Sequence, residues 1–144
     1  MSRVPATGTL YLIDTSAFAR VSVPSVRKVM VGLIAEGVVA TCITVDMEAG
    51  YSGRTADDVR LIAENRRALY RNLPITEPIA EHARQVQLRM AARGQHRAAG
   101  IVDLLTAAVA EHYGAIILHY HSDFEHIASV TGQQQLWIAP RGTL

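Results

Sequence analysis

Residues 10–16 read LYLIDTS, a short apolar run that ends on an acid and two hydroxyl residues. Such continuous apolar runs are typical of strands buried on both faces, as in a parallel sheet. We therefore expect a strand over Leu10–Ile13 that ends at Asp14. Four further runs are expected to form strands, namely Val38–Ile43, Leu73–Ile75, Ala115–His119 and an edge strand over Gln135–Ile138.

The intervals between these strands carry apolar residues at helical spacing. Pro24 suits the first turn of one helix and Gly37 its end. Thr44 is expected to cap a helix that carries Asp46 and Glu48. The remaining helices are expected from a capping box at Thr55 and Asp58 to about Tyr70, from Thr76 to Gly94, over Ile101–Tyr113, and from a second capping box at Ser122 and Glu125.

Strands that alternate with helices indicate an α/β fold with a parallel sheet. We expect a central sheet of four to five parallel strands flanked by helices. With 144 residues and no internal repeat or linker, the chain is expected to be one domain over residues 1–144. Residues 1–8 are expected to be a loose N-terminal lead-in.

The amino-acid composition excludes several classes of protein. Hydrophobic residues make up 49% of the chain, which is ordinary for a globular domain. Cys42 is the only cysteine, so neither an internal disulfide nor a Cys/His zinc motif is available. The longest strongly apolar run, Gly37–Val45, is far shorter than the roughly 18 residues of a membrane helix. No secretory signal pattern opens the chain, and we expect a cytoplasmic protein that does not enter the membrane.

The net charge of +1 hides an asymmetry among the basic residues. Of the 14 basic residues 13 are Arg, and nine of them lie between Arg54 and Arg97. Arg binds phosphate through two parallel hydrogen bonds, so this group, with Arg20 and Arg27, is a candidate for contacts with a phosphate-rich partner. The alternative, which composition alone favours, is that these side chains simply pair with acids on exposed helix faces.

Four acids are expected to meet at one edge of the sheet. Asp14 ends the first strand, Glu48 follows the second strand and Asp123 follows the fourth. Asp103 lies in the first turn of the helix that leads into the fourth strand, in an apolar setting where an acid is rarely buried without a partner. Ligands of parallel sheets bind beyond the carboxyl ends of the strands. Mg²⁺ and Mn²⁺ prefer oxygen ligands, so the four carboxylates predict a divalent-metal site.

Each acid also has a purely structural explanation. Asp14 can cap a helix, and Glu48 can be an exposed helix residue. Asp103 and Asp123 can complement helix dipoles. Asp46 is expected at the surface or behind the site, and Thr15 and Ser16 are expected to be ordinary caps.

Four blocks in this order resemble the PIN domain, and more narrowly a VapC toxin of a VapBC toxin–antitoxin pair of the mycobacterial type. The resemblance covers about Thr9–Pro140. The blocks are Leu12-Ile13-Asp14-Thr15-Ser16-Ala17, Thr44 with Glu48, Asp103-Leu104-Leu105-Thr106-Ala107-Ala108, and Leu118-His119-Tyr120 ahead of Asp123-Phe124-Glu125-His126.

The resemblance implies a PIN-type, Rossmann-like sandwich and a Mg²⁺- or Mn²⁺-dependent endoribonuclease that cleaves structured RNA such as tRNA or rRNA. It implies that the catalytic and metal-binding residues are Asp14, Glu48, Asp103 and Asp123. It also implies a homodimer and a cognate VapB-type antitoxin that inhibits the enzyme.

One position departs from the family pattern. Relatives commonly carry an acid where this chain has His121, two residues before Asp123. Three interpretations follow: Asp123 serves alone as the acid there, which we favour; His121 favours Mn²⁺ or moves protons; or catalysis is weakened and the protein only binds RNA or an antitoxin. A phosphatase of the haloacid-dehalogenase type is disfavoured because Ser16 stands where its second Asp would be.

Overall fold

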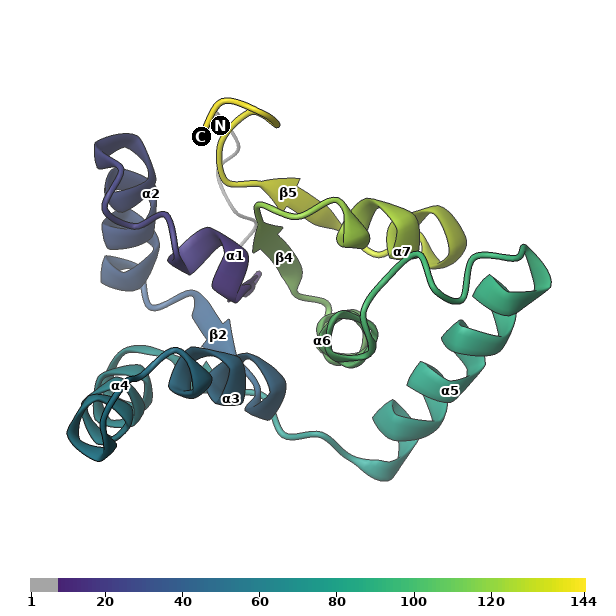
Figure 1. Cartoon of the computed structure of the whole chain (residues 1–144), viewed down its shortest axis with the longest axis horizontal. Coiled ribbons are helices and arrows are strands. Elements are labelled where there is room, and N and C mark those ends of the chain that lie inside the picture. Colours follow the sequence, from purple (N-terminus) through teal and green to yellow (C-terminus); the bar gives the residue numbers. More distant parts are fainter. Residues whose placement is uncertain (1–7) are drawn as a thin grey trace.

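The chain forms a parallel five-stranded sheet with helices on both faces (Figure 1), in a computed structural model that describes residues 8–144. The order across the sheet is β3-β2-β1-β4-β5. This confirms the predicted α/β fold and the edge position of the last strand. The predicted lead-in lies, apart from Gly8, outside the described residues. The strands are β1 (Tyr11–Ile13), β2 (Val39–Thr41), β3 (Arg71–Asn72), β4 (Ile116–His119) and β5 (Gln135–Trp137).

Side chains alternate between two cores, one on each face of the sheet. Tyr11 and Ile13 of β1 face the core covered by α1 (Thr15–Phe18) and α2 (Pro24–Ala35). Leu12 faces the other core, together with side chains of four helices. These are α3 (Ile43–Tyr51), α5 (Glu77–Ala92), α6 (Ile101–Tyr113) and α7 (Asp123–Thr131). The remaining helix, α4 (Ala56–Leu69), packs beside α3.

Several helix boundaries fall where the sequence placed them. Pro24 opens α2, and Gly37 follows its end with a left-handed φ of 70°. Gly114 caps the end of α6 in the same left-handed backbone conformation, which residues other than glycine rarely adopt. Thr55 caps α4 by accepting a hydrogen bond from the Asp58 backbone N–H at 3.1 Å.

The third strand lies earlier than predicted. It pairs Arg71 and Asn72 with β2, and Leu73 continues the ladder by one hydrogen bond to Thr41. Pro74 has no N–H to donate, so the ladder stops there. The apolar residues Leu73 and Ile75, which suggested the strand, instead pack against the core beyond it.

Two predicted helix caps are wrong. α3 begins at Ile43 with Cys42 as its N-cap, and the Thr44 hydroxyl instead forms a hydrogen bond with the Thr106 hydroxyl of α6 at 2.8 Å. Ser122 makes no side-chain cap at α7. The His121 imidazole takes that role, because its Nδ1 accepts the Asp123 backbone N–H at 3.2 Å.

The topology fixes where a ligand can bind. β1 lies in the middle of the sheet, with β2 on one side and β4 on the other. The chain therefore leaves β1 and β4 on opposite sides of a crevice at their carboxyl ends, the usual binding position in such sheets. Among residues 8–144, no helix has both the length and the hydropathy needed to cross a bilayer.

Candidate metal centre

Asp14 lies at the carboxyl end of β1, and only 3% of its surface is exposed. Its Oδ2 accepts hydrogen bonds from the Ser16 backbone N–H at 3.0 Å and from the Ser16 hydroxyl at 2.5 Å. Its Oδ1 is buried and has no hydrogen-bond partner among the described residues. Buried polar atoms are nearly always partnered in native proteins, so this oxygen is available to a ligand such as a cation.

Glu48 reaches the same point from α3, where the Thr15 hydroxyl donates a hydrogen bond to its Oε1 at 3.1 Å. One carboxylate oxygen each from Asp14, Glu48 and Asp103 lie within 4.8 Å of one another. Burial raises the pKa of Glu48, and repulsion by Asp14 raises it further. The site therefore holds more negative charge than its own hydrogen bonds neutralise.

Asp103 lies in the first turn of α6 between the other acids. Burial, the largest cause, and repulsion by Asp14, Asp123 and Glu48 together raise its pKa to about 8. Its side chain is 16% exposed. A carboxyl group in this state holds a proton at neutral pH unless a cation replaces that proton.

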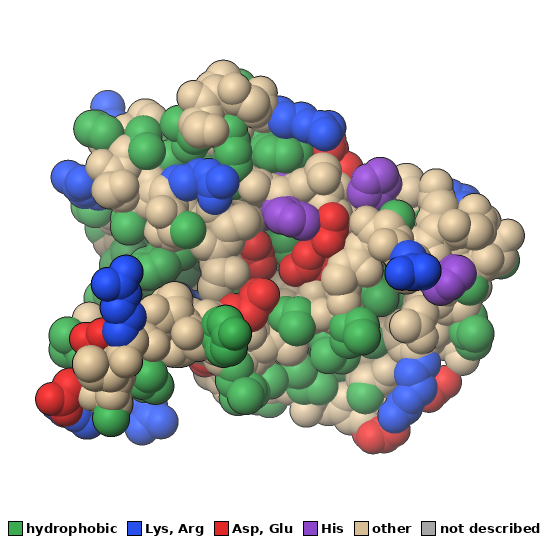
Figure 2. Space-filling model, in the orientation of Figure 1, with side chains coloured by type: hydrophobic (Ala, Val, Ile, Leu, Met, Phe, Trp, Pro, Cys, Tyr) green, Lys and Arg blue, Asp and Glu red, His purple; other side chains and the backbone are tan. Residues whose placement is uncertain are grey.

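Asp123, the first residue of α7, completes the cluster. Its Oδ2 accepts the Gly100 backbone N–H at 3.0 Å at the start of α6. Its Oδ1 lies 3.3 Å from the His121 Nδ1, which is 3.9 Å from the Asp103 Oδ2. Figure 2 shows carboxylates gathered in the middle of one face with a histidine beside them.

The structure thus brings together all four acids that the sequence singled out. Mg²⁺ and Mn²⁺ take oxygen ligands, and the Oδ1 of Asp14 offers one that nothing else engages. The residues present therefore fit a divalent cation. Asp14, Glu48 and Asp103 would hold it, with Asp123 on the far side of Asp103.

Comparison with known proteins agrees with the fold. Residues 11–130 match the family model of the PIN domain. Ribonuclease VapC21 of Mycobacterium tuberculosis is 37% identical over 135 residues, which cover 94% of this chain and 98% of the relative. The chain belongs to the VapC group of PIN domains. Ribonuclease VapC51 of the same organism is 40% identical over 137 residues, covering 93% of this chain and 96% of that protein.

Solved structures share the PIN fold at low sequence identity. VapBC2 from Rickettsia felis, bound to a DNA fragment from its promoter, matches with a TM-score of 0.75 at 12% identity, covering 90% of this chain and 98% of that one. DNA-bound VapBC from Salmonella typhimurium has a TM-score of 0.74 at 14% identity, with coverage of 91% and 99%.

The prediction that Thr15 and Ser16 are ordinary helix caps is wrong, because Asp14 caps α1 of this PIN domain. Thr15 holds Glu48, and the Ser16 hydroxyl donates to Asp14 while accepting the Tyr120 backbone N–H at 2.9 Å. Ser16 therefore ties the end of β1 to the end of β4. The sequence offered the Asp-Thr-Ser pattern as a signal, but a cap explains the same pattern.

Asp46 lies outside the acid cluster of the PIN domain, as expected. Its Oδ1 accepts hydrogen bonds from the Arg66 Nε and the Thr41 hydroxyl, both at 2.7 Å. Arg66 is 5% exposed and also donates to Thr41 at 3.0 Å. This ion pair joins α3 to α4 and does not contribute to the metal centre.

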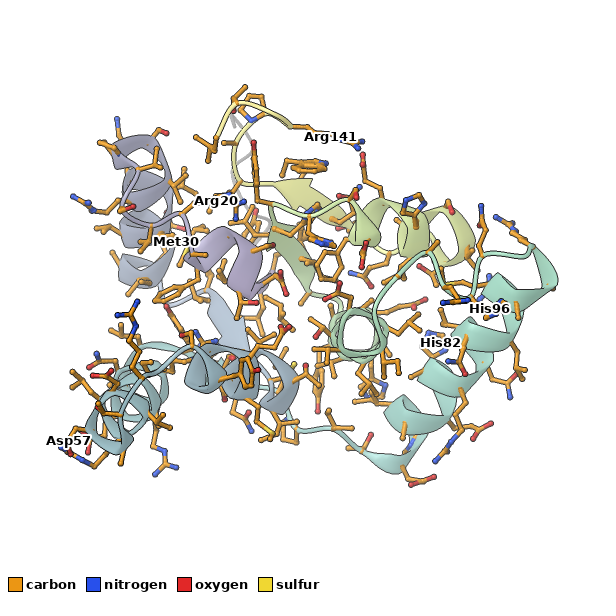
Figure 3. All side chains as sticks on the ribbon, viewed as in Figure 1. Arg20, Met30, Asp57, His82, His96 and Arg141 are labelled. Atoms are coloured by element: carbon orange, nitrogen blue, oxygen red, sulfur yellow. The ribbon has the colours of Figure 1, made fainter. Side chains whose placement is uncertain are left out.

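The predicted arginine cluster does not form as one surface. Arg60, Arg66 and Arg67 lie on α4, and Arg84 and Arg89 lie on α5. These two helices lie at opposite sides of the PIN domain in Figure 1. Five of the nine bind within the protein, namely Arg60, Arg66, Arg84, Arg89 and Arg93. Arg20 is better placed. Figure 3 shows it beside α1, where it donates to the Ser16 carbonyl at 2.7 Å and stacks on the Tyr120 ring.

Proposed function

We propose that this protein is the toxin of a type II toxin–antitoxin pair and a Mg²⁺- or Mn²⁺-dependent endoribonuclease of the cytoplasm. Its substrate would be structured RNA such as tRNA or rRNA. The observation that carries the proposal is the convergence of Asp14, Glu48, Asp103 and Asp123 at one crevice. It is supported by relatives that are named ribonucleases and that this chain matches over nearly its whole length.

The chain's own residues would supply the binding and orientation. Asp14 would hold the cation through the Oδ1 that lacks another partner, while Ser16 fixes its Oδ2. Glu48 and Asp103 would complete the position, and Thr15 would orient Glu48. A divalent cation in such a site lowers the pKa of water and stabilises charge on a phosphodiester.

Proton release would accompany cation binding at Asp103. Because its pKa is raised to about 8, this carboxyl group keeps a proton at neutral pH in the cation-free protein. Cation and proton compete for the same oxygen. Activity is therefore expected to rise as the pH increases toward 8 at a fixed, subsaturating cation concentration.

Arg20 is the residue that we propose for a backbone phosphate of the RNA. Its guanidinium lies over Tyr120 with the ring centroid 4.3 Å away, and one N–H group binds the Ser16 carbonyl. This contact fixes the planar group next to Ser16, whose hydroxyl holds Asp14. Contacts of this type position RNA without reading its sequence.

An antitoxin segment has a place to bind beside Glu48. Two hollows with mostly apolar walls flank this residue, one of about 340 Å³ between α1 and α3 and one of about 470 Å³ between α3 and α6. Apolar grooves of this kind receive amphipathic helices. We propose a VapB-type antitoxin there and a homodimer of the toxin. Co-expression with the product of a short reading frame directly upstream would test the antitoxin.

The activity is tested with purified protein and a mixture of tRNA and rRNA, with RNA ends mapped after brief incubation. Cleavage should require Mn²⁺ or Mg²⁺ and stop with EDTA. Asp14→Asn and Asp103→Asn should each lower the rate by about 100-fold or more, as loss of other electrostatic groups does. Asp57→Asn, at the outer end of α4 (Figure 3), is the matched control. Undiminished cleavage by both site variants would refute the assignment.

A further inference from the structure

The only tryptophan of the chain lies at the edge of the sheet, outside the two cores. Trp137 ends the edge strand β5, where it pairs with His119, the last residue of β4. Its side chain is partly exposed and, among residues 8–144, belongs to neither hydrophobic core. Tryptophan contributes a large apolar area wherever it packs into a core. Core packing therefore does not explain the tryptophan at this position.

We propose that Trp137 is a platform on which an unpaired RNA base stacks, and that Arg20 and Arg141 bind phosphates of the same strand. This rests on the proposed function, because it names the part of the RNA that lies beside the metal centre. It extends the phosphate contact of Arg20 to a site for a single strand.

Two arginines and two aromatic rings form a continuous series of contacts. The Arg20 guanidinium lies 4.3 Å from the centroid of the Tyr120 ring. The Tyr120 and Trp137 rings meet edge to face with their centroids 5.3 Å apart, and the Arg141 guanidinium lies 5.6 Å from the Trp137 centroid. Figure 3 shows Arg20 beside α1 and Arg141 near β5. Positive charge combined with aromatic rings is how proteins bind single-stranded nucleic acid.

This series of contacts starts next to the metal centre. Tyr120 directly follows β4, and its backbone N–H donates to the Ser16 hydroxyl at 2.9 Å. The same hydroxyl donates to the Asp14 Oδ2 at 2.5 Å. One hydroxyl group therefore separates Tyr120 from the acid cluster. A nucleotide next to a phosphate at that cluster is expected to lie against Tyr120 and Trp137.

Arg141 can exchange its present partner for a phosphate. It donates to the Glu125 Oε1 at 3.0 Å, in a pair whose side chains are 66% and 40% exposed. Exposed ion pairs contribute little to stability, whereas a guanidinium binds phosphate through two parallel hydrogen bonds. When Arg141 moves from Glu125 to a phosphate, the face of the Trp137 ring becomes accessible to a base.

The test uses the full chain in EDTA and the fluorescence of Trp137, which reports on this site alone because the chain has no other tryptophan. The probes are a short oligoadenylate and a duplex of the same oligoadenylate with oligouridylate, and gel electrophoresis confirms that both stay intact. The single strand should quench the emission. The duplex should leave it largely unchanged, because only an unpaired base can stack on the ring.

Variants separate stacking from charge. Trp137→Leu should weaken binding of the labelled single strand by about fivefold or more, the scale of one base on an aromatic ring. Trp137→Phe should restore most of the affinity. Arg141→Gln should lower the slope of log affinity against log salt by about 0.7, the value of one phosphate contact to a single strand. Arg84→Gln breaks a similarly exposed pair with Glu81 on α5 and is the control.

The outcomes separate this proposal from the proposed function. An emission that does not change when the single strand binds, equal quenching by the duplex, or equal affinities of Trp137→Leu and the wild type would overturn the stacking site alone. A protein that binds no single strand would overturn it as well. RNA that quenches Trp137 but is not cleaved when Mn²⁺ is added would instead refute the proposed function and leave the stacking site supported.

Discussion

Asp14 uses its two carboxylate oxygens differently, and Ser16 determines which one is available. The Ser16 hydroxyl holds Oδ2 and accepts the Tyr120 N–H on its other side, so Oδ1 is left toward the other acids. Removing the hydroxyl leaves Oδ2 held by the Ser16 backbone N–H alone and leaves the Tyr120 backbone N–H without this partner. Ser16 is therefore a positioning residue of the metal centre.

We predict that Ser16→Ala weakens Mn²⁺ binding by about tenfold or more, as the loss of other groups behind metal ligands does. Ser16→Thr retains a hydroxyl and should restore most of the affinity. Titration calorimetry measures both. Ser52→Ala removes a hydroxyl that bonds only the Ala49 carbonyl and serves as the control. Equal affinities in Ser16→Ala and the wild type would contradict the role.

The raised pKa of Asp103 predicts how stability depends on pH without a cation. Folded protein keeps this proton up to about pH 8, whereas the unfolded chain releases it near the ordinary value of 3.8. Between these values the folded state holds the extra proton, so this group makes the free energy of unfolding fall as pH rises. One group contributes at most about 1.4 kcal/mol per pH unit.

Urea unfolding in EDTA from pH 5 to 8 measures this effect. In Asp103→Asn the free energy of unfolding should decrease less as the pH rises. This variant should be more stable than the wild type at pH 8, although it binds Mn²⁺ more weakly. Asp57→Asn removes an acid that is 90% exposed and should retain the wild-type slope. If the free energy of unfolding changed with pH equally in Asp103→Asn and the wild type, the buried acid would not be the cause of the pH dependence.

At the residue scale, the sequence predicted the four acids but not the side chains that orient them. Acids near strand ends can be located from the order of elements alone. The Thr15–Glu48 and Ser16–Tyr120 hydrogen bonds join residues 33 and 104 positions apart. Such bonds depend on side-chain rotamers and on how closely two strands pack, and a single sequence encodes neither in a readable pattern.

At the element scale, α3 and α4 are joined by the buried pair of Arg66 and Asp46. Arg66 is 5% exposed, while the Asp46 side chain is 35% exposed. Without Asp46 the buried guanidinium keeps only its hydrogen bond to Thr41, whereas without Arg66 the carboxylate is still partly hydrated. Replacing Asp46 and replacing Arg66 should therefore destabilise the protein to different extents.

We predict that Asp46→Ala destabilises the protein by about 3 kcal/mol, the lower end of the range for a buried charge left alone. Arg66→Met should be milder, because Asp46 remains partly hydrated. Urea unfolding at pH 7 measures both. Arg60→Ala, which breaks only exposed pairs with Asp57 and Glu64, should stay under about 1 kcal/mol. A smaller effect of Asp46→Ala than of Arg66→Met would contradict this account.

Elements with clear start and stop residues were predicted closely, and the misplaced ones show what local patterns miss. The bounds of α2 and α6 follow from Pro24, Gly37 and Gly114. The third strand was placed on apolar Leu73–Ile75, but its pairing partner β2 and the following Pro74 determine its register. Apolar character marks burial, and burial alone does not distinguish a strand from the segment that follows it.

For the molecule as a whole, cation binding would connect four elements. The cluster draws on the end of β1, on α3 and on the first turns of α6 and α7. A ligand present at 100 times its Kd stabilises the bound state by about 2.7 kcal/mol. Local openings that break the site should then become about 100-fold rarer.

Hydrogen exchange with and without saturating Mn²⁺ tests this. Exchange should slow in α3 and at the starts of α6 and α7, while α2, on the other face of the sheet, keeps its rates. Asp14→Asn should lose the slowing. Uniform slowing across all helices would mean that the cation stabilises the fold globally and not through the cluster.

The pairing of β1 with β4 brings Tyr11 beside Ile116, so the crevice lies between segments that are far apart in the sequence. A ribosome makes Asp14 and Glu48 early, and it makes Asp103 and Asp123 late. Until β4 has emerged and inserted beside β1, a growing polypeptide lacks Asp123 and has no crevice between these strands. The acid cluster can therefore form only after most of the described chain has been translated.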